Sequence, residues 1–272
     1  MSMPRFPQNI AHRGARSLAP ENTIAAARRA VEAGADMWEL DVTLTADGEL
    51  IVLHDDTLNR TTNAAAVFPD RSPWKADTFL LDEIRALDAG SWFVDQDPFG
   101  QIAAEVVSEE DCDSYISEKI PTLEEALLFT REHNWHVNVE IKDAANRPGS
   151  AIIVERVLYL IRKLEMADHV LISSFNHHYL IRSKQMSPHI KTAALVAMPT
   201  MFAARKLEQI HAQAYHPRKG AISPYRIQAL QKRGFAVNVW TVNEENDLAR
   251  FIEWGVDGLI TDFPQRLQAM KP

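Results

Sequence analysis

The chain has 272 residues, of which 46% are hydrophobic and 24% charged, a composition typical of a soluble globular protein with a large core. Its formal net charge of −8 argues against a nucleic-acid binder, which normally carries a basic face. Cys112 is the single cysteine, which excludes an intramolecular disulfide and a zinc cluster built on cysteines. No apolar run is long enough to span a bilayer, and residues 1–8 lack the apolar core of a signal peptide. We therefore expect a reduced, cytoplasmic protein without stable membrane insertion.

The first part of the chain alternates short apolar runs with one amphipathic stretch. Strands are predicted over residues 9–12 and 37–44. Between them, Asn22 or Thr23 can cap a helix over residues 23–33, which Gly34 ends. A tight turn at Asp47-Gly48 then leads into a hairpin-like extension over residues 49–54.

From residue 136 onwards the alternation becomes regular. Strands are predicted over 137–141, 170–173, 192–196, 213–215, 236–240 and 258–260. Helices are predicted over 151–164, 177–185, 202–211, 224–232, 244–254 and 264–270. With the first two strands this gives eight β units separated by helices, so we predict a single (β/α)8 TIM barrel over residues 1–272. An open doubly wound sheet is the alternative, although no Gly-x-Gly-x-x-Gly segment follows the first strand.

Roughly residues 60–120 break this pattern between the second and third β/α units. They contain one predicted helix, 81–87, an acidic patch at residues 109–111, and the aromatic side chains Trp74, Trp92, Phe93 and Phe99. A loop of this length is usually functional or independently structured. We interpret it as an insertion over the catalytic face that shapes the mouth of the pocket. A contact between the subunits of a homodimer is the alternative.

Charged and polar side chains stand where the apolar strands of the barrel should end. These are His12, Glu39, Asp41, His54, Glu140 and Lys142. The two-residue spacing of the second and third strands puts both members of each pair on one face. Unpaired burial of such charges would be costly, whereas grouping around a cation would stabilise them. Any one of them could be a turn or an exposed edge residue, but together they fall at successive strand ends, where barrel active sites lie.

The residue types indicate a metal site with acid–base groups. Three carboxylates, Glu39, Asp41 and Glu140, without a cysteine form a hard-oxygen site suited to Mg²⁺ or Ca²⁺. His12 and His54 can supply an acid and a base because their pKa values lie close to neutral pH. The site is thus equipped for a displacement that needs two proton transfers.

Two cations complete the set. Arg13 can hold a phosphate oxygen as a fork and Lys142 as a point charge, so the residues fit phosphodiester cleavage best. A magnesium-dependent aldolase or enolase-like barrel, with Lys142 as base or Schiff-base residue, is the rival enzyme class. The alternative that is not an enzyme is a degenerate barrel that binds phosphodiesters without turnover.

Motifs along nearly the whole chain resemble those of a known family. They are Ile10-Ala11-His12-Arg13-Gly14, Pro20-Glu21-Asn22-Thr23, Glu39-Leu40-Asp41-Val42, His54-Asp55, Val139-Glu140-Ile141-Lys142, Ser173-Ser174-Phe175 and Trp240-Thr241-Val242-Asn243, with further matches at 87–93, 120–125 and 255–262. In this order they resemble the glycerophosphodiester phosphodiesterase family of the cytoplasmic bacterial type.

The resemblance implies a (β/α)8 barrel that hydrolyses a small-molecule glycerophosphodiester to sn-glycerol 3-phosphate and an alcohol. The roles it implies are metal ligation by Glu39, Asp41 and Glu140, acid–base catalysis by His12 and His54, phosphate contact by Arg13 and Lys142, a place near the metal for Glu21, and an apolar wall beside the glycerol for Trp240. The stretch between Phe93 and Ile120 is long and acidic for this family, which leaves the alcohol open. A lysophospholipase D acting on acylated glycerophosphodiesters is the closest alternative, and it would have the insertion's aromatic side chains bind a lipid chain.

Overall fold

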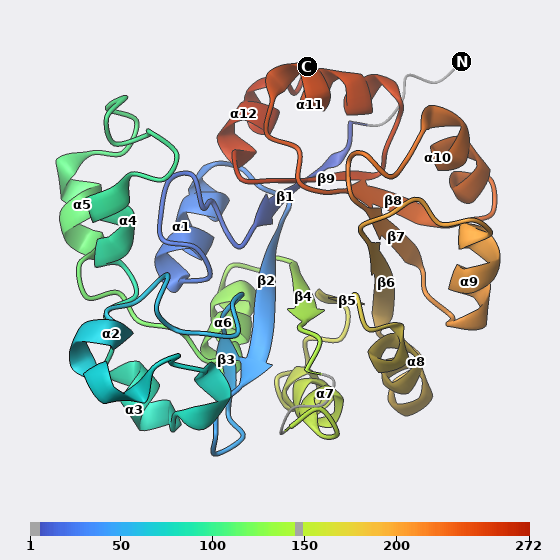
Figure 1. Cartoon of the computed structure of the whole chain (residues 1–272). Coiled ribbons are helices and arrows are strands. Elements are labelled where there is room, and N and C mark those ends of the chain that lie inside the picture. The colour runs from blue at the N-terminus through green and yellow to red at the C-terminus, as the bar shows by residue number, and fades with distance from the viewer. Residues whose placement is uncertain (1–5, 145–148) are drawn as a thin grey trace.

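Eight parallel strands form a closed barrel in the computed structural model, which describes residues 6–144 and 149–272 (Figure 1). The strands are β1 (Gln8–His12), β2 (Met37–Leu44), β4 (Val137–Ile141), β5 (Val170–Ser174), β6 (Lys191–Val196), β7 (Ala214–Pro217), β8 (Ala236–Val239) and β9 (Gly258–Thr261). Each is paired in parallel with the next, and β1 pairs with both β2 and β9, which closes the barrel. The predicted (β/α)8 barrel is confirmed. Residues 1–5 belong to the segment in which no signal peptide was predicted, and they lie outside the described residues.

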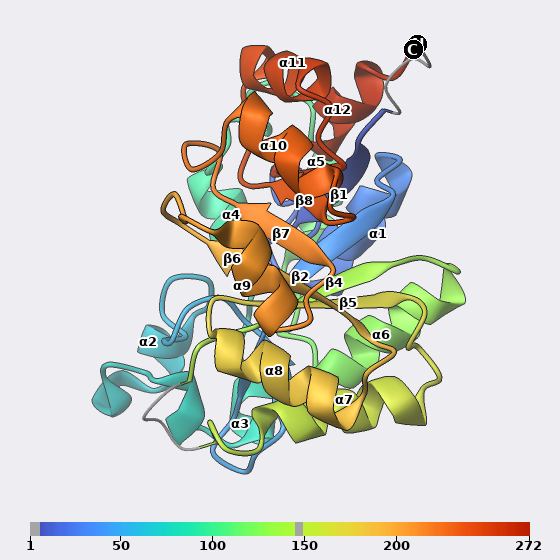
Figure 2. The same ribbon diagram turned by 90° about the vertical axis from the view of Figure 1, so that its right-hand side faces the viewer.

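Helices follow the strands and cover the outside of the barrel (Figure 2). They are α1 (Ile24–Glu32), α6 (Leu123–Glu132), α7 (Ile153–Lys163), α8 (His177–Met186), α9 (Ala203–Gln209), α10 (Pro224–Gln231), α11 (Glu245–Glu253) and α12 (Pro264–Ala269). Thr23, one of the two predicted capping residues, caps α1: its hydroxyl accepts a hydrogen bond from the Ala26 amide at 3.1 Å. Across the described part of the chain, no helix combines the length and apolar character needed to cross a bilayer.

The helix α6 was not predicted, although its sequence carries a start signal. The Thr122 hydroxyl accepts a hydrogen bond from the Glu125 amide, and the Glu125 carboxylate accepts one from the Thr122 amide at 2.7 Å. This reciprocal capping box, Thr-x-x-Glu, satisfies two amide groups that the first helical turn leaves without partners. This motif predicts a helix after residue 122, and that helix would have extended the regular alternation of strands and helices back to the second β/α unit.

The insertion leaves the barrel after β3 (Leu50–Val52), which pairs antiparallel with β2 as the predicted hairpin, and it returns at α6. It therefore lies between the strand and the helix of the second unit. Its elements are α2 (Ala64–Val67), two 3₁₀ turns (Pro69–Arg71 and Ala76–Thr78), α3 (Leu81–Arg85), α4 (Ser91–Gln96) and α5 (Glu109–Tyr115). The helix predicted over 81–87 is present as α3, but α2, α4 and α5 were not predicted, because helices of four to seven residues are too short to show a hydrophobic period.

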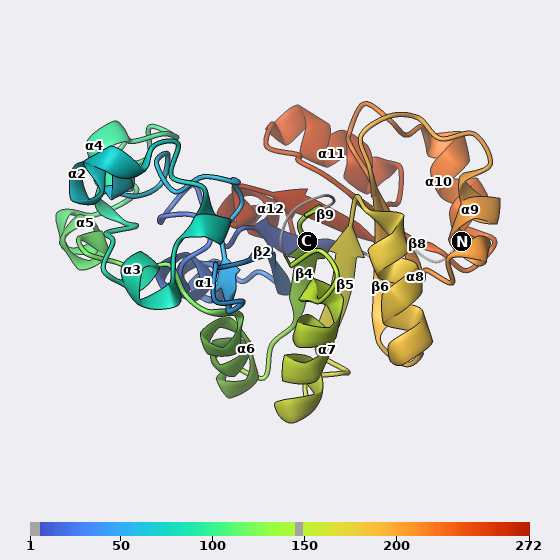
Figure 3. The same ribbon diagram turned by 60° about the horizontal axis from the view of Figure 1, so that its bottom comes forward.

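The insertion has a small apolar core of its own. Buried side chains from β3, α3 and the loops between them, including Leu58, Phe79 and Ile84, pack apart from the main core. Trp74 packs against this core, whereas Phe93 is fully buried in the main one, so the aromatic side chains do not form a single cluster. The insertion lies on one side of the barrel, and α8, α9 and α10 lie on the opposite side (Figure 3).

The inside of the barrel is apolar at one end and polar at the other. Leu171, Ala193, Ala214 and Ala236, from four consecutive strands, pack as one layer near the strand starts. Charged and polar side chains occupy the carboxyl ends of the strands instead. The site therefore lies at the end of the barrel where active sites of this fold occur, with a small apolar layer near the strand starts.

Candidate active site

Strand register brings the predicted site residues together. His12 on β1 lies opposite Glu39 on β2, and Asp41 on β2 lies opposite Glu140 on β4. Neighbouring strands in a sheet are about 4.8 Å apart, so side chains on the same face at paired positions come into contact. Lys142 follows β4 directly and extends the same face. The sequence prediction that these side chains share one face at the strand ends is consistent with this geometry.

Three buried carboxylates form a cluster. Glu39, Asp41 and Glu140 each offer an oxygen, and these oxygens lie within 4.8 Å of one another. Burial and the neighbouring Asp41 charge raise the pKa values of Glu39 and Glu140. The Oε1 atom of Glu39 is buried without a hydrogen-bond partner among the described residues. Like charges held together with a free oxygen are stabilised by a cation, so the residues fit a divalent metal that prefers oxygen ligands.

Arg13 and Lys142 partly balance the cluster. The Lys142 Nζ atom lies 3.3 Å from an Asp41 oxygen and 3.1 Å from Glu140 Oε1, and Arg13 Nε lies 3.3 Å from Asp41. Burial alone would raise the pKa of Asp41, but these two cations lower it below its usual range. With all carboxylates ionised, the three acids and two cations leave a formal charge of −1. A bound divalent ion would make it +1, which matches a phosphodiester monoanion.

The backbone around Arg13 explains why this segment carries a glycine. Arg13 adopts a left-handed conformation (φ 56°) and its amide donates a hydrogen bond to Glu39 Oε2 at 3.0 Å. Gly14 also has positive φ, and a Cβ atom there would lie 2.6 Å from the backbone carbon of Ala26. Only glycine fits this close approach. The turn therefore aims both the amide and the guanidinium of Arg13 at the carboxylates.

Each predicted catalytic histidine is held by an aspartate. His12 Nδ1 lies 2.6 Å from Asp262 Oδ1, and His54 Nδ1 lies 2.6 Å from Asp55 Oδ1. Because an ionised carboxylate only accepts hydrogen bonds, each Nδ1 donates and each Nε2 is left for chemistry. His12 Nε2 lies 4.0 Å from the Glu39 carboxylate. Burial lowers the pKa of His12, which favours its neutral form near pH 7.

Asp262 is itself fixed in place. Its Oδ2 accepts a hydrogen bond from Asn243 Nδ2 at 2.7 Å, and Arg16 lies 3.7 Å from its Oδ1. Burial would raise the pKa of Asp262, but the charges of His12 and Arg16 lower it to about 2. The carboxylate therefore stays ionised at neutral pH and keeps the His12 ring oriented.

Glu21 lies outside the carboxylate cluster. Its oxygens pair with Arg13 at 2.9 Å, Arg16 at 2.7 Å and Arg60 at 2.7 Å. Burial would raise its pKa, but the three guanidinium groups lower it to about 2. Glu21 thus orients the arginine that touches Asp41, and its place near a metal stays a prediction.

Trp240 lies at the end of β8. Its indole N–H donates a hydrogen bond to the His216 carbonyl at 2.7 Å, and its ring packs edge-to-face with Phe175, with centroids 5.6 Å apart. It also packs against the interior cluster of Ile10, Met37 and Ile260. This position suits the predicted apolar wall.

Several residues of the site were not predicted to act there. They are Asp262, Asn243, Asn22, Arg16, Arg60 and Asp55. Asp262 had a signal, because it follows β9 just as His12 ends β1. Asn22 had none: its amide donates to Asp41 at 3.0 Å only because the loop before α1 folds back over β2.

The chain is similar to other proteins and to solved structures over almost its whole length. The model of the glycerophosphoryl diester phosphodiesterase family matches residues 12–266. A glycerophosphodiester phosphodiesterase of Caldanaerobacter subterraneus is 38% identical, with 95% of both chains covered. A second glycerophosphodiester phosphodiesterase, from Bacillus subtilis, is 32% identical, covering 96% of this chain and 85% of that one.

Solved structures agree with this. A phosphodiesterase of Oleispira antarctica, solved in complex with the product sn-glycerol-3-phosphate, superposes with a TM-score of 0.78 at 27% identity, covering 97% of this chain and 96% of that one. A glycerophosphodiester phosphodiesterase of Agrobacterium tumefaciens superposes with a TM-score of 0.74 at 27% identity, covering 97% and 100%. The resemblance seen in the motifs is confirmed: the chain belongs to the glycerophosphoryl diester phosphodiesterase family.

Proposed function

We propose that this protein hydrolyses glycerophosphodiesters to sn-glycerol 3-phosphate and an alcohol, using a divalent metal ion and two histidines. The observation that carries the proposal is the pair of aspartate-held histidines beside a cluster of three buried carboxylates. Family membership and the product bound by the Oleispira antarctica relative support the substrate class.

Glu39, Asp41 and Glu140 would hold the metal. Their oxygens are the ligands that Mg²⁺ and Ca²⁺ prefer, and the free Glu39 Oε1 offers one more electron pair. When bound, such an ion polarises a phosphate oxygen and lowers the pKa of a coordinated hydroxyl group. Arg13 and Lys142 would orient the phosphate and balance its charge from their places beside Asp41.

The histidines would move the protons. His12 is suited to act as the base, because burial keeps its ring neutral and Asp262 leaves Nε2 with its lone pair. His54, half-exposed and held by Asp55, would then protonate the departing alkoxide. If a glycerol hydroxyl is the nucleophile, a cyclic glycerol phosphate forms and water opens it with the two histidines exchanging roles. If water attacks directly, the same two proton transfers suffice.

The observations disfavour two alternative functions, an aldolase-type barrel and a lysophospholipase D. Burial would lower the pKa of Lys142, but Asp41 and Glu140 raise it above its usual range, so the amine stays protonated and cannot readily form a Schiff base. This counts against an aldolase-type barrel. A lysophospholipase D that binds a lipid chain through Phe93 or Trp74 is also disfavoured, because Phe93 is fully buried and Trp74 packs against the insertion's core.

A substrate panel tests the proposal. Glycerophosphocholine, glycerophosphoethanolamine, glycerophosphoglycerol, glycerophosphoinositol and a lysophospholipid would be incubated with Mg²⁺, with Ca²⁺ and with chelator, and glycerol 3-phosphate and free alcohol measured. We expect release of glycerol 3-phosphate that chelator abolishes reversibly. Single-turnover phosphorus NMR would detect the cyclic species and separate the two routes.

Variants of the histidines complete the test. His12→Ala and His54→Ala should lower kcat by about a hundredfold to ten-thousandfold, with KM little changed, since general acid–base catalysis contributes on that scale. The exposed His178 provides a matched control, and His178→Ala should be as active as the native protein. Native rates in either catalytic variant would refute the assignment.

A further inference from the structure

Positive charge is concentrated on one side of the barrel. Between Asp168 and Glu244 the sequence holds ten lysine and arginine residues and a single acidic residue, Glu208. This stretch forms β5 to β8 with α8, α9 and α10, which lie side by side on one face of the molecule (Figure 2). The other 36 of the 37 acidic residues belong to the rest of the chain. Although the net charge of the whole chain is −8, this side of the barrel is therefore basic.

Large apolar side chains are exposed to solvent on this same side. Met198, Met201 and Phe202, in the loop from β6 to α9, are 72%, 73% and 74% exposed, and Tyr225, at the start of α10, is 79% exposed. Exposure of this size is unusual for clustered apolar side chains and marks an interaction surface. The loop follows the carboxyl end of β6, so these side chains lie at the end of the barrel that carries the catalytic groups.

Basic side chains accompany them. Arg205 is the third residue of α9 and Arg218 directly follows β7, so both lie at the same end of the barrel. Both are exposed, and neither forms an ion pair with any residue that the structure describes. We call the surface formed by Met198, Met201, Phe202, Tyr225, Arg205 and Arg218 the rim.

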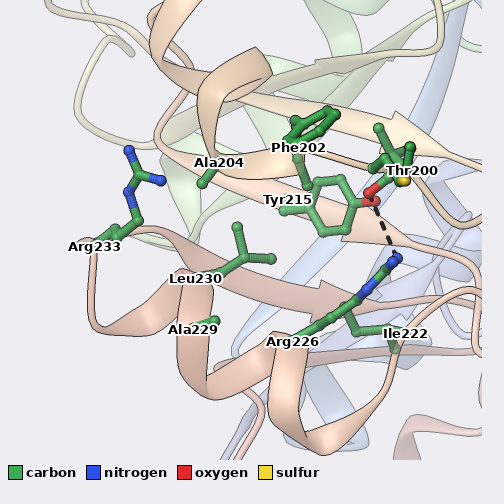
Figure 4. A pocket seen from close by; sticks show the side chains of 11 residues that line it. Thr200, Phe202, Ala204, Tyr215, Ile222, Arg226, Ala229, Leu230 and Arg233 are labelled. Atoms are coloured by element: carbon green, nitrogen blue, oxygen red, sulfur yellow. Dashed lines mark hydrogen bonds between the residues drawn. The ribbon is translucent and has the colours of Figure 1, made fainter.

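A recess opens beside the rim. It has a volume of about 240 Å³ and lies between α9 and α10 (Figure 4). Phe202, Tyr215 and Leu230 give it an apolar lining. Arg226 stands at its edge, where its Nη1 donates a hydrogen bond to the Thr200 carbonyl at 3.5 Å. The recess is thus apolar inside and cationic at its edge, as a site for one lipid chain with an anionic head would be.

We propose that the rim docks the protein on an anionic phospholipid surface, with the catalytic end of the barrel turned toward the lipid. Exposed Met and Phe side chains enter the boundary between headgroups and acyl chains, while unpaired arginines attract anionic headgroups. Charge complementarity selects this occupant, because the acidic remainder of the chain is repelled by the same surface and orients the rim toward it.

Other occupants fit less well. A nucleic acid would need aromatic platforms for its bases along a charged groove, whereas two of the four exposed apolar side chains are methionines. A second copy related by twofold symmetry would place Arg205 and Arg218 against the same arginines, and like charges repel. Both remain outcomes that the experiment distinguishes.

The experiment measures co-sedimentation of the full-length chain with vesicles of phosphatidylglycerol and with vesicles of phosphatidylcholine. We expect binding to phosphatidylglycerol that high salt weakens, and much weaker binding to phosphatidylcholine. The double variants Arg205→Glu/Arg218→Glu and Met201→Ser/Phe202→Ser should each lower the bound fraction by at least about tenfold, since each charged or apolar group at the lipid boundary contributes on the order of a factor of five to ten.

Matched controls lie at the opposite end of the barrel, where the helices end. Lys232 follows α10 and Met186 ends α8, so Lys232→Glu and Met186→Ser repeat the chemical changes away from the rim and should bind as the native protein does. All variants should hydrolyse a soluble glycerophosphodiester at native rates, so loss of folding or of the proposed function is separated from loss of docking. Absence of native binding to phosphatidylglycerol, or native binding by both rim variants, would overturn the proposal. So would binding of an oligonucleotide or self-association that the rim variants abolish while vesicle binding is unchanged.

Discussion

The strands β1, β2 and β4 carry His12, Glu39, Asp41 and Glu140 at paired positions, whereas β5, β6 and β8 end in neutral side chains such as Ser174, Val196 and Val239. In the first half of the barrel the charges point inward and pair with one another, so burial strengthens each interaction. In the second half the charges point outward on the helices and loops, with few acidic partners. The same barrel therefore buries paired charges inside its first half and exposes basic side chains on the outside of its second half.

The difference shows why the position of a residue in a barrel predicts its catalytic role only in part. Both halves place their loops at the same end, yet a carboxylate can be buried there only where cations or a metal compensate it. Arg13, Arg16 and Arg60 provide that compensation around Glu21 and Asp41 in the first half. The carboxylate cluster and both histidines therefore lie in the half in which these arginines converge, while Asp262, after β9, holds His12 from the other half.

The largest effect is expected in the carboxylate cluster. Glu39→Gln keeps the side chain's shape but removes a charge that would ligate the metal, so kcat/KM should fall by at least about a thousandfold, or ~4 kcal/mol. The thermal midpoint of the metal-free protein should be unchanged or higher, because the variant relieves repulsion by Asp41 and Glu140.

The matched control is Glu118→Gln, since burial also raises the pKa of Glu118 but it lies outside the cluster. It should leave kcat/KM unchanged. Phosphatidylglycerol binding should survive Glu39→Gln if the two halves are independent. A fully active Glu39→Gln protein would contradict the proposed metal site.

A smaller effect is expected when the support of His12 is removed. Asp262→Asn replaces an acceptor with a group that can also donate, so the ring can take the wrong tautomer and kcat should fall by about tenfold to a thousandfold while KM changes little. Steady-state kinetics measures kcat and KM separately and so tests this prediction.

Asp257→Asn at the opposite end of β9 changes the same residue type where it bonds only backbone and Gln231, and it should lower stability without lowering kcat. Equal loss of kcat in both variants would mean that Asp262 acts through folding and does not position His12.

The last effect lies in the second half of the barrel and concerns stability, with a change within any single pH unit that is smaller than the effect expected for Glu39→Gln. His216 is fully buried on β7, its Nε2 lies 2.9 Å from Asn238 Nδ2, and burial lowers its pKa to about 3. Between the ordinary value of 6.5 and about 3, the unfolded chain takes up a proton that the folded chain does not. His216 should therefore lower the free energy of unfolding as pH falls through this range, by up to about 1.4 kcal/mol per pH unit.

Urea unfolding at several pH values measures the effect. His216→Asn should flatten the decline between neutral and mildly acidic pH, whereas His189→Asn, at an exposed position, should leave it unchanged. An identical decline in native protein and His216→Asn would show that other groups govern acid stability.

The barrel and most of the site could be predicted because both follow from local patterns. Alternating apolar runs and helices predicted eight units, and period-2 spacing placed Glu39 with Asp41. The short helices of the insertion could not be predicted, because they form only when packed around residues such as Leu58 and Phe79. The position of Asp262 at a strand end was visible in the sequence, but its hydrogen bond to His12 and its support by Asn243 were not, because 250 residues separate His12 from Asp262.

By itself, the sequence determined which residue types stand at which strand ends, and hence that carboxylates and histidines would meet if a barrel closed. Only the tertiary structure decided how they are held: the β1–β9 pairing that closes the barrel brings Asp262 to His12, and the folded loop before α1 brings Glu21 between three arginines. The same closure separates a catalytic half from a basic half. The physical reason is that side-chain periodicity is local, whereas compensation of buried charge depends on which distant segments pack together.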